Sequence, residues 1–245
     1  MKHFALTLLL SCSFLLISCS GEKSDQQQND ETKNATTDWI TLFDGNTFDG
    51  WKVYGSDSIT SEWEIIDGAI VCHSGAGEEN RGFSPTSLRT LDTFGNFEFE
   101  LEYKIGKGGN SGIFYHVVES DEYGYDFQTG PEYQVLDDEF SRSESEPFKM
   151  VGSNYAMHAP TVEKQINPYM QWNKVKIVYD NGRVEHWLNG IKLLEFEEGS
   201  DAWKALKAKS KWAETESYAK YKTGSFSLQN HGDEVHYRNI RVRKL

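Results

Sequence analysis

The chain has 245 residues, a formal net charge of −13 and 13% aromatic residues; its length fits one large all-β domain or two smaller domains. Nucleic acid is not expected as a partner, because such an acidic chain lacks the basic patch that replaces counterions on a phosphate backbone. The sequence also contains no basic amphipathic helix of the kind that holds a protein on an anionic membrane.

The first 19 residues predict a lipoprotein signal peptide. Lys2 precedes an apolar run that ends in the sequence LISC at residues 16–19, a pattern in which the cysteine becomes the acylated first residue of the mature chain. Cys19 is therefore the predicted lipidation site; Cys12 follows a shorter apolar run, and an ordinary secretory signal is the alternative. A lipid anchor predicts a location in the periplasm or at the cell surface, on a membrane that the protein does not span.

A polar segment separates this signal from the folded part. Residues 20–37 are almost free of large apolar side chains, so they cannot bury enough surface to fold and should form a flexible tether. The folded part is expected over residues 38–245. Cys72 is the only cysteine in it, which leaves no disulfide within the domain and favours a buried, unreactive thiol.

Strand patterns dominate the folded part from its start. Residues 62–73 consist of two short apolar runs around Asp67 and Gly68, a strong signal for a two-residue hairpin. Residues 97–104 alternate strictly between Phe, Leu or Tyr and Glu or Lys, as in a half-buried antiparallel strand. The three glutamates of this run are therefore expected on an exposed sheet face and not in a catalytic site.

The second half of the chain continues as strands with one short helix. Residues 172–197 predict a three-stranded meander, because two Asn-Gly pairs separate its apolar runs. Residues 201–209 predict a helix with Asp201 as its N-cap, and residues 223–245 are expected to close the chain as a further hairpin. Many short strands with turn signals between them predict a single all-β sandwich of two antiparallel sheets.

Three segments carry polar side chains next to glycines, where a core strand would be apolar. Their sequences are GGNSGIFYH at 108–116, GPEYQVLDD at 130–138 and LQNHGDEVHYRN at 228–239. Glycines let a ligand approach the backbone closely, and amides, carboxylates and a guanidinium beside aromatic rings suit the hydroxyls and flat faces of a sugar. A solvated sheet face is the alternative; the sequence has no metal-ligand spacing, nucleophile elbow or phosphate loop that would indicate another chemistry.

Five segments, in chain order, resemble those of one known family. They are WITLFDGNTFDGWKVYG, GNSGIFYH, GPEYQVLDD, WNKVKIVYDNGRVEHWLNG and GSFSLQNHGDEVHYRNIRVRKL. The chain is similar from Trp39 to its C-terminus to the 3-keto-disaccharide hydrolase family, whose members are also described as 3-keto-glucoside lyases and hydratases. The resemblance implies a concanavalin A-like jelly roll of two curved antiparallel sheets, and a substrate whose glucose ring carries a ketone at carbon 3.

Such a substrate implies cleavage by elimination. The C3 ketone acidifies the C2 proton, a base removes that proton, and the glycosidic group leaves from C1. Water then adds to the enone, so that the lyase and hydratase steps together give net hydrolysis. This route needs a base, an acid and a group that stabilises the enolate oxygen, in contrast to the paired carboxylates of ordinary glycosidases.

The family motifs place the candidate site residues on the three polar segments. Glu132 and His231 are the candidate catalytic residues, and either of them is a candidate for the base at C2. The candidate substrate-binding residues are Asn110, Tyr115, Gln134, Gln229 and Arg238. Arg238 or a divalent cation is the candidate stabiliser of the enolate; Asp137 is the candidate ligand for such a cation, and the cofactor otherwise stays open.

A lectin-like sandwich that binds glycans without catalysis is the alternative function, because it would use the same polar face. The co-occurrence of Glu132, His231 and Arg238 favours an enzyme, since sugar binding alone does not require groups that titrate. A structural assembly protein is disfavoured, because the charged C-terminal sequence RVRKL gives no sign of a long apolar sheet edge.

Overall fold

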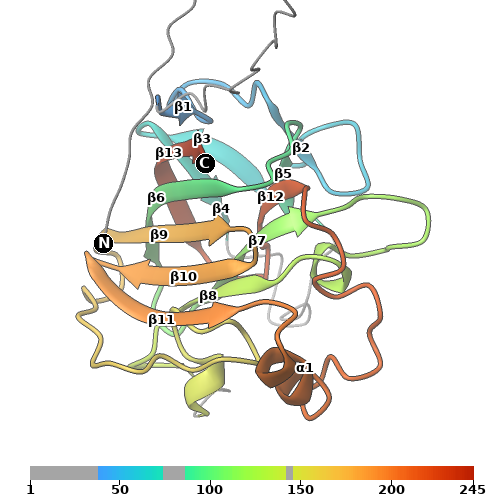
Figure 1. Ribbon diagram of the computed structural model, residues 1–245. Helices are drawn as coiled ribbons and strands as arrows, with labels where there is room; N and C mark the ends of the chain where they lie inside the picture. The colour runs from blue at the N-terminus through green and yellow to red at the C-terminus, as the bar shows by residue number, and fades with distance from the viewer. Residues whose placement is uncertain (1–37, 74–85, 142–145) are drawn as a thin grey trace, which may run out of the picture. The chain divides into compact units, whose positions relative to one another are not determined.

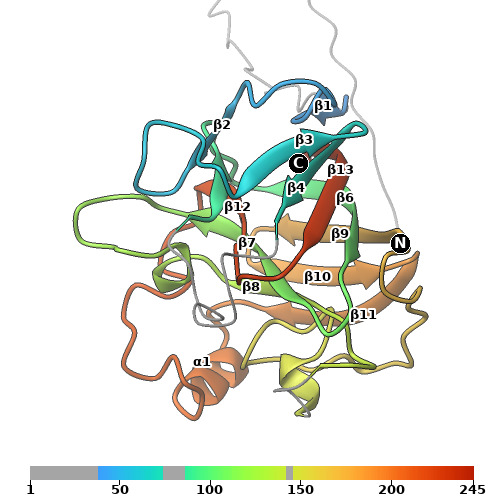
Figure 2. The same ribbon diagram turned by 180° about the vertical axis from the view of Figure 1, so that it is seen from behind.

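Two antiparallel β-sheets stack face to face in the computed structural model, which describes residues 38–73, 86–141 and 146–245 (Figure 1). Figure 2 shows the same stack from behind. The predicted signal peptide, the lipidation site Cys19 and the tether lie outside the described residues and stay predictions. No helix within those ranges is long and apolar enough to cross a membrane.

The larger sheet has eight strands in the order β11, β10, β9, β6, β13, β4 and β3, with β1 paired to β13. Its strands are β1 (Ile40–Thr41), β3 (Trp63–Ile66), β4 (Ala69–Cys72), β6 (Phe97–Ile105), β9 (Asn173–Asp180), β10 (Arg183–Leu188), β11 (Ile191–Glu197) and β13 (Val235–Lys244). The smaller sheet has five strands in the order β2, β5, β12, β7 and β8. Its strands are β2 (Trp51–Val53), β5 (Leu88–Thr90), β7 (Asn110–Val117), β8 (Glu132–Leu136) and β12 (Ser225–Leu228).

Helices are few in the part of the chain that the structure describes. They are α1 (Asp201–Lys207) and the short 3₁₀ helices η2 (Asp126–Gln128) and η3 (Pro147–Lys149). Trp203 of α1 is buried and stacks on Tyr218, with ring centroids 6.3 Å apart. The all-β sandwich with one short helix, as predicted from the sequence, is therefore confirmed.

The core lies between the two sheets and follows the predicted alternation. On β6, Phe97, Phe99 and Leu101 are buried in this core, whereas the glutamates between them point to the outer face. The prediction of an exposed glutamate face is only partly right, because ion pairs with β9 and β13 leave these side chains buried or half-buried. From the smaller sheet, Tyr133 and Val135 face the same core.

Cys72 is a buried free thiol, as expected, and burial raises its pKa to about 12, which makes the thiol unreactive.

The predicted two-residue turns are all present. Asp67 and Gly68 have φ values of 50° and 74°, and the Asn-Gly pairs at 181–182 and 189–190 also lie in the left-handed region. Asn and Gly tolerate this conformation, which type I′ turns require at both central positions. The turns therefore fix the register of the β3–β4 hairpin and of the β9–β10–β11 meander.

Two details of the prediction are wrong. The last two strands do not form a hairpin: β12 pairs with β5 and β7 in the smaller sheet, whereas β13 pairs with β4 and β6 in the larger one. The segment between them crosses from sheet to sheet and has no two-residue turn to fold it back. The N-cap of α1 is Ser200 and not Asp201, because the Ser200 hydroxyl accepts a hydrogen bond from the Trp203 amide at 3.2 Å.

Candidate functional site

A pocket of about 390 Å³ lies on the outer face of the smaller sheet. Its described lining consists of Asn110, Tyr125, Phe127, Glu132, Gln134, Tyr155, Lys211, Gln229 and His231. Five of the seven catalytic and substrate-binding candidates are among them, and they come from β7, β8 and the segment after β12. The fold therefore gathers polar segments that are up to 121 residues apart in the sequence, as the contact between Asn110 and His231 shows.

The β7–β8 pairing directs Glu132 and Gln134 into this pocket. Gly112 stands opposite Gln134, and Tyr133 and Val135 alternate with the two polar residues and face the core. Glu132 and Gln134 are 4% and 2% exposed, so the pocket face of β8 is covered by neighbouring chain and is not a solvated sheet face. The alternation is that of an ordinary strand, but here both faces are buried.

Gly112 leaves the space that the Glu132 carboxylate occupies. A Cβ at this position would lie 2.2 Å from Oε1 of Glu132, which is far inside van der Waals contact. The Asn-Ser-Gly motif therefore has a steric reason for its glycine. Ser111, the residue before it, points to the core side, where its hydroxyl bonds to the Tyr237 hydroxyl and to the Gln229 carbonyl, both at 2.7 Å.

A chain of amide hydrogen bonds links three polar residues of the pocket: Gln134, Asn110 and His231. Gln134 Nε2 donates to Asn110 Oδ1 at 2.9 Å, and Asn110 Nδ2 lies 3.4 Å from His231 Nε2. With the amide oriented in this way, Nε2 of His231 accepts from Asn110. Two backbone N–H groups hold the segment that carries His231 on β7. The backbone N–H of Gln229 donates to the Gly112 carbonyl at 2.9 Å, and the backbone N–H of Asn110 donates to the Asp233 carboxylate at 3.0 Å.

Gln229 also presents an acceptor with no partner among the described residues. Its Oε1 is buried and forms no hydrogen bond, and its side chain lines the pocket. A buried polar atom without a partner costs about 1–3 kcal/mol. A ligand hydroxyl at this position would satisfy it.

Aromatic rings form the opposite wall of the pocket. Tyr125 stacks on Phe127, with ring centroids 5.2 Å apart and an interplanar angle of 10°. Phe127 contacts Trp212 in a tilted arrangement, with ring centroids 6.2 Å apart. Lys211 Nζ lies 4.0 Å from the centroid of the Tyr155 ring. Flat aromatic surfaces next to amides and a carboxylate match the requirements of a sugar ring, with an apolar face for stacking and hydroxyls for hydrogen bonding.

A buried carboxylate fixes the part of this wall that comes from η2. Asp126 accepts a hydrogen bond from the Ser227 hydroxyl at 2.7 Å and from the Phe127 amide at 2.9 Å. Burial raises the pKa of Asp126, while these hydrogen bonds favour its charged form. Asp126 lies beneath the pocket wall and is not among the residues that line the pocket, so its role is to position Phe127.

The sequence analysis missed four of the lining residues: Tyr125, Phe127, Tyr155 and Lys211. They lie in irregular segments or in η2, where no strand periodicity marks a face. The available signal was the density of aromatic residues outside strands, as in YGYDF at 123–127.

The structure does not bring Tyr115 or Arg238 to the pocket. Tyr115 is fully buried in the core, and burial raises its pKa well above the ordinary value. Tyr115 lies an odd number of residues after Asn110 on β7, so the two side chains point to opposite faces of the strand. Arg238 lies on the outer face of the larger sheet, where it pairs with Glu102 at 2.7 Å and covers the Trp172 ring at 3.9 Å.

Asp137 also lies away from the pocket. Its Oδ2 accepts a hydrogen bond from the Gly108 amide at 2.8 Å, so the carboxylate ties the end of β8 to the turn before β7. Over residues 38–73, 86–141 and 146–245, no group of three or more His, Cys, Asp or Glu side chains is placed to hold a metal ion. The described donor set in the pocket is one carboxylate, one imidazole and the amide oxygens.

Comparisons with known proteins place this chain in a family. Residues 38–243 match the model of the 3-keto-alpha-glucoside-1,2-lyase-like domain. A 3-keto-disaccharide hydrolase of Bacteroides thetaiotaomicron is 34% identical over 275 aligned positions, which cover 94% of each chain.

Solved structures agree with this match. A candidate glycosyl hydrolase from Parabacteroides distasonis is 37% identical, with a TM-score of 0.75 over 84% of this chain and 94% of that one. BuGH16B, at 9% identity and a TM-score of 0.52 over 84% of this chain and 92% of its own, shares the fold alone. The sandwich is thus of the concanavalin A-like type, and the chain belongs to the 3-keto-disaccharide hydrolase family.

Proposed function

We propose that the pocket cleaves 3-keto-glucosides by removing the C2 proton and eliminating the group at C1, with water adding back to give net hydrolysis. The observation that carries this proposal is that Glu132 and His231 line one pocket, in which hydrogen bonds connect His231 through Asn110 to Gln134, the next pocket-facing residue after Glu132 on β8. Family membership supports the substrate class.

Glu132 is the proposed base. Its carboxylate lies on the floor of the pocket over Gly112, on a strand whose backbone is paired, so its position is fixed by a rigid element. His231 is half-buried at the end of the chain of hydrogen bonds from Gln134 through Asn110 and is the proposed partner that protonates the leaving oxygen and later activates water. The opposite assignment exchanges the two roles and is separated by the experiment below.

The enolate oxygen needs a donor or a positive charge close to it. Arg238 no longer qualifies, because it lies on the other sheet. Lys211 is a cation in the described pocket lining, and the Asn110 and Gln134 amides add hydrogen-bond donors. We assign enolate stabilisation to this group, and stacking of the sugar ring to Tyr125 and Phe127.

The test uses residues 38–245, because the whole described core lies between Phe43 and Val242. The protein is incubated with 3-keto-trehalose and a 3-keto-β-glucoside, and with the same sugars lacking the ketone. Release of 3-keto-glucose or of the 2-hydroxy-glucal from the keto sugars alone supports the proposal. Cleavage of the unoxidised sugars would contradict it, because elimination requires the acidic C2 proton.

Deuterium exchange at C2 separates the two roles. Glu132→Gln should abolish exchange from D₂O, whereas His231→Gln should retain exchange and lose cleavage. The matched control is Glu163→Gln, which makes the same change at an exposed position. Loss of exchange in His231→Gln alone would reverse the assignment.

A non-catalytic lectin-like module is the second candidate, and the aromatic wall with its amides favours it. In that case the domain would bind the keto sugars without exchange or cleavage, and Glu132→Gln would change affinity alone.

A further inference from the structure

The outer face of the larger sheet carries a strip of charge opposite in sign to that of the whole chain. The basic strip consists of the charged outward side chains on β6, β9 and β13: Glu98, Glu100, Glu102, Lys104, Lys174, Lys176, Asp180, Arg238, Arg241 and Arg243. Six of these are basic and four are acidic, which gives a formal charge of +2 in a chain of −13. The neighbouring ion-pair group on β10 and β11 is balanced.

Within the strip, each glutamate is less exposed than the basic residues that pair with it. The Glu100 side chain is 11% exposed, whereas Lys174 and Arg241, which pair with it, are 49% and 42% exposed. Burial acts to raise the pKa of Glu100, but hydrogen bonds from Arg241 and Lys174 outweigh it and hold that pKa below its usual value. The glutamates therefore hold the cations in place, and the cations are the more exposed partners of these ion pairs.

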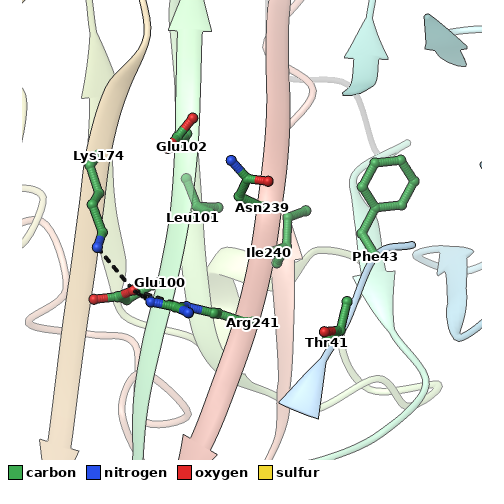
Figure 3. A pocket seen from close by; sticks show the side chains of 9 residues that line it. All are labelled: Thr41, Phe43, Glu100, Leu101, Glu102, Lys174, Asn239, Ile240 and Arg241. Carbon is green, nitrogen blue, oxygen red and sulfur yellow. Dashed lines mark hydrogen bonds and ion pairs between the residues drawn. The ribbon is translucent and has the colours of Figure 1, made fainter. Parts of the chain in front are cut away.

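A hollow of about 350 Å³ opens in this strip (Figure 3). It forms at a β-bulge, where β13 shifts register against β6 between Arg238 and Arg241, and Asn239 in the bulge has a φ of 53°. Bulges that re-aim side chains are retained features of folds. The polar lining of the hollow is Thr41, Asn239, Lys174, Arg241, Glu100 and Glu102, and both Lys174 and Arg241 pair with Glu100.

The charged groups that line this hollow are two basic and two acidic, so the net positive charge of the strip comes from the cations around it. A second hollow of about 180 Å³ shares Glu100 and Lys174 and extends across β9 to Trp187. Two adjoining hollows on one sheet face therefore have both cations and carboxylates in their linings.

Three tryptophans support the cations of the strip. Arg241 lies 4.2 Å from the Trp39 ring centroid, Arg238 lies 3.9 Å from that of Trp172, and Lys176 lies 4.0 Å from that of Trp187. Cation–π contacts of this kind hold a charge over the ring, and tryptophan is enriched where proteins meet a membrane surface. The chain also enters the fold here, because β1, directly after Trp39, pairs with β13.

We propose that the basic strip docks on an anionic phospholipid surface. The Glu132 pocket opens on the outer face of the other sheet, so a protein docked in this way presents its pocket away from the membrane. The proposal stands on charge and geometry and does not depend on the catalytic proposal or on the lipid anchor. Each basic residue near an anionic surface contributes about fivefold to binding, and salt screens this attraction.

The test measures sedimentation of residues 38–245, which lack the predicted anchor, with vesicles of phosphatidylcholine alone or with one third phosphatidylglycerol. Binding is expected to the anionic vesicles only, and it should be lost at ~1 M salt, where the Debye length falls to about 3 Å. Lys174→Gln with Arg241→Gln should weaken binding by roughly tenfold or more. The matched control, Lys204→Gln with Lys220→Gln, removes the same charge from exposed positions off the strip and should bind like the parent.

A second variant tests the opposite direction without removing a cation. Glu102→Gln raises the formal charge of the strip and should strengthen vesicle binding, and thermal unfolding of every variant shows whether the fold is intact. Equal binding to neutral and anionic vesicles, no binding to either, or equal binding by parent and double variant would overturn the proposal. Capture of soluble polygalacturonate through the strip, with no vesicle binding, would also overturn it and make the strip a glycan surface. No outcome involves turnover, so failure here is distinct from failure of the proposed chemistry.

Discussion

Gly112→Ala is the sharpest perturbation of the pocket, because it adds one methyl group directly beneath the Glu132 carboxylate. The new Cβ would lie 2.2 Å from Oε1 and 2.9 Å from Cδ of Glu132. Ordinary contact requires roughly 3.4 Å or more, so the carboxylate must move by about 1 Å. A misplacement of about 1 Å costs on the order of 100-fold in rate, or about 2.7 kcal/mol in the barrier.

The same substitution should leave the fold nearly unchanged. The atoms nearest to the new methyl all belong to the Glu132 side chain, which can swing away, and alanine suits a strand better than glycine by roughly 0.5–1 kcal/mol. The free energy of unfolding should therefore change by less than about 1 kcal/mol. The assay is kcat/KM on a 3-keto-glucoside, with urea unfolding of the same preparation.

Gly190→Ala provides the matched control. Gly190 has a φ of 84°, and a Cβ added there would have nothing within 4 Å, so alanine should lower stability by about 1–2 kcal/mol through backbone strain and leave activity intact. Adding Glu132→Gln to Gly112→Ala should lower activity little beyond Glu132→Gln alone, since both act on one carboxylate. Full activity in Gly112→Ala, or a loss that only follows lost folding, would refute the reasoning.

Three further outcomes follow from the structure. Burial lowers the pKa of His116 to about 4 and that of His186 to about 3, from 6.5. Because both histidines are neutral in the folded protein at neutral pH, their contribution to the free energy of unfolding is fully present above about pH 6.5. It should fall by about 1.4 kcal/mol per pH unit per histidine towards pH 4, where the unfolded chain binds protons that the folded protein does not. Urea unfolding at several pH values should show this slope, and His186→Phe should make it shallower; a slope unchanged in that variant would count against the assignment. Arg238→Gln should leave kcat/KM within about twofold, because Arg238 lies on the sheet opposite the pocket; a large loss of turnover with an intact fold would return Arg238 to the site. Phe127→Ala should raise KM more than it lowers kcat, by roughly tenfold, because it removes a stacking surface of about 1–1.5 kcal/mol; an effect on kcat alone would instead place Phe127 beside the reacting atoms.

Local sequence patterns were sufficient for much of the fold. The alternation from Phe97 to Lys104 predicted both faces of β6, and the Asn-Gly and Asp-Gly pairs predicted the tight turns that the structure contains. These features depend on residues close in the chain, since side-chain parity and left-handed turn conformations are local properties. The polar segments that hold Glu132, Gln134 and His231 were also visible, because polar residues beside glycines depart from the pattern of a core strand.

The alternation of side chains along a strand could have placed Tyr115 on the core side, but it could not have placed Arg238. Tyr115 has the opposite parity to Asn110, so the sequence already separated them across β7. For Arg238, the alternation indicates which face of its strand the side chain lies on, but not which of the two sheets contains that strand. Only the pairing of β13 with β6 places it on the larger sheet, away from the pocket.

Charge distribution shows most clearly what the tertiary structure decided. The chain as a whole is acidic, yet strand order brings β6, β9 and β13 together so that cations from distant segments surround covered glutamates. The aromatic wall of the pocket likewise comes from segments without periodicity. A sequence determines which side chains share a strand face, because that geometry is local; which faces meet depends on the pairing of strands far apart in the chain, and that pairing exists only once the sheets have formed.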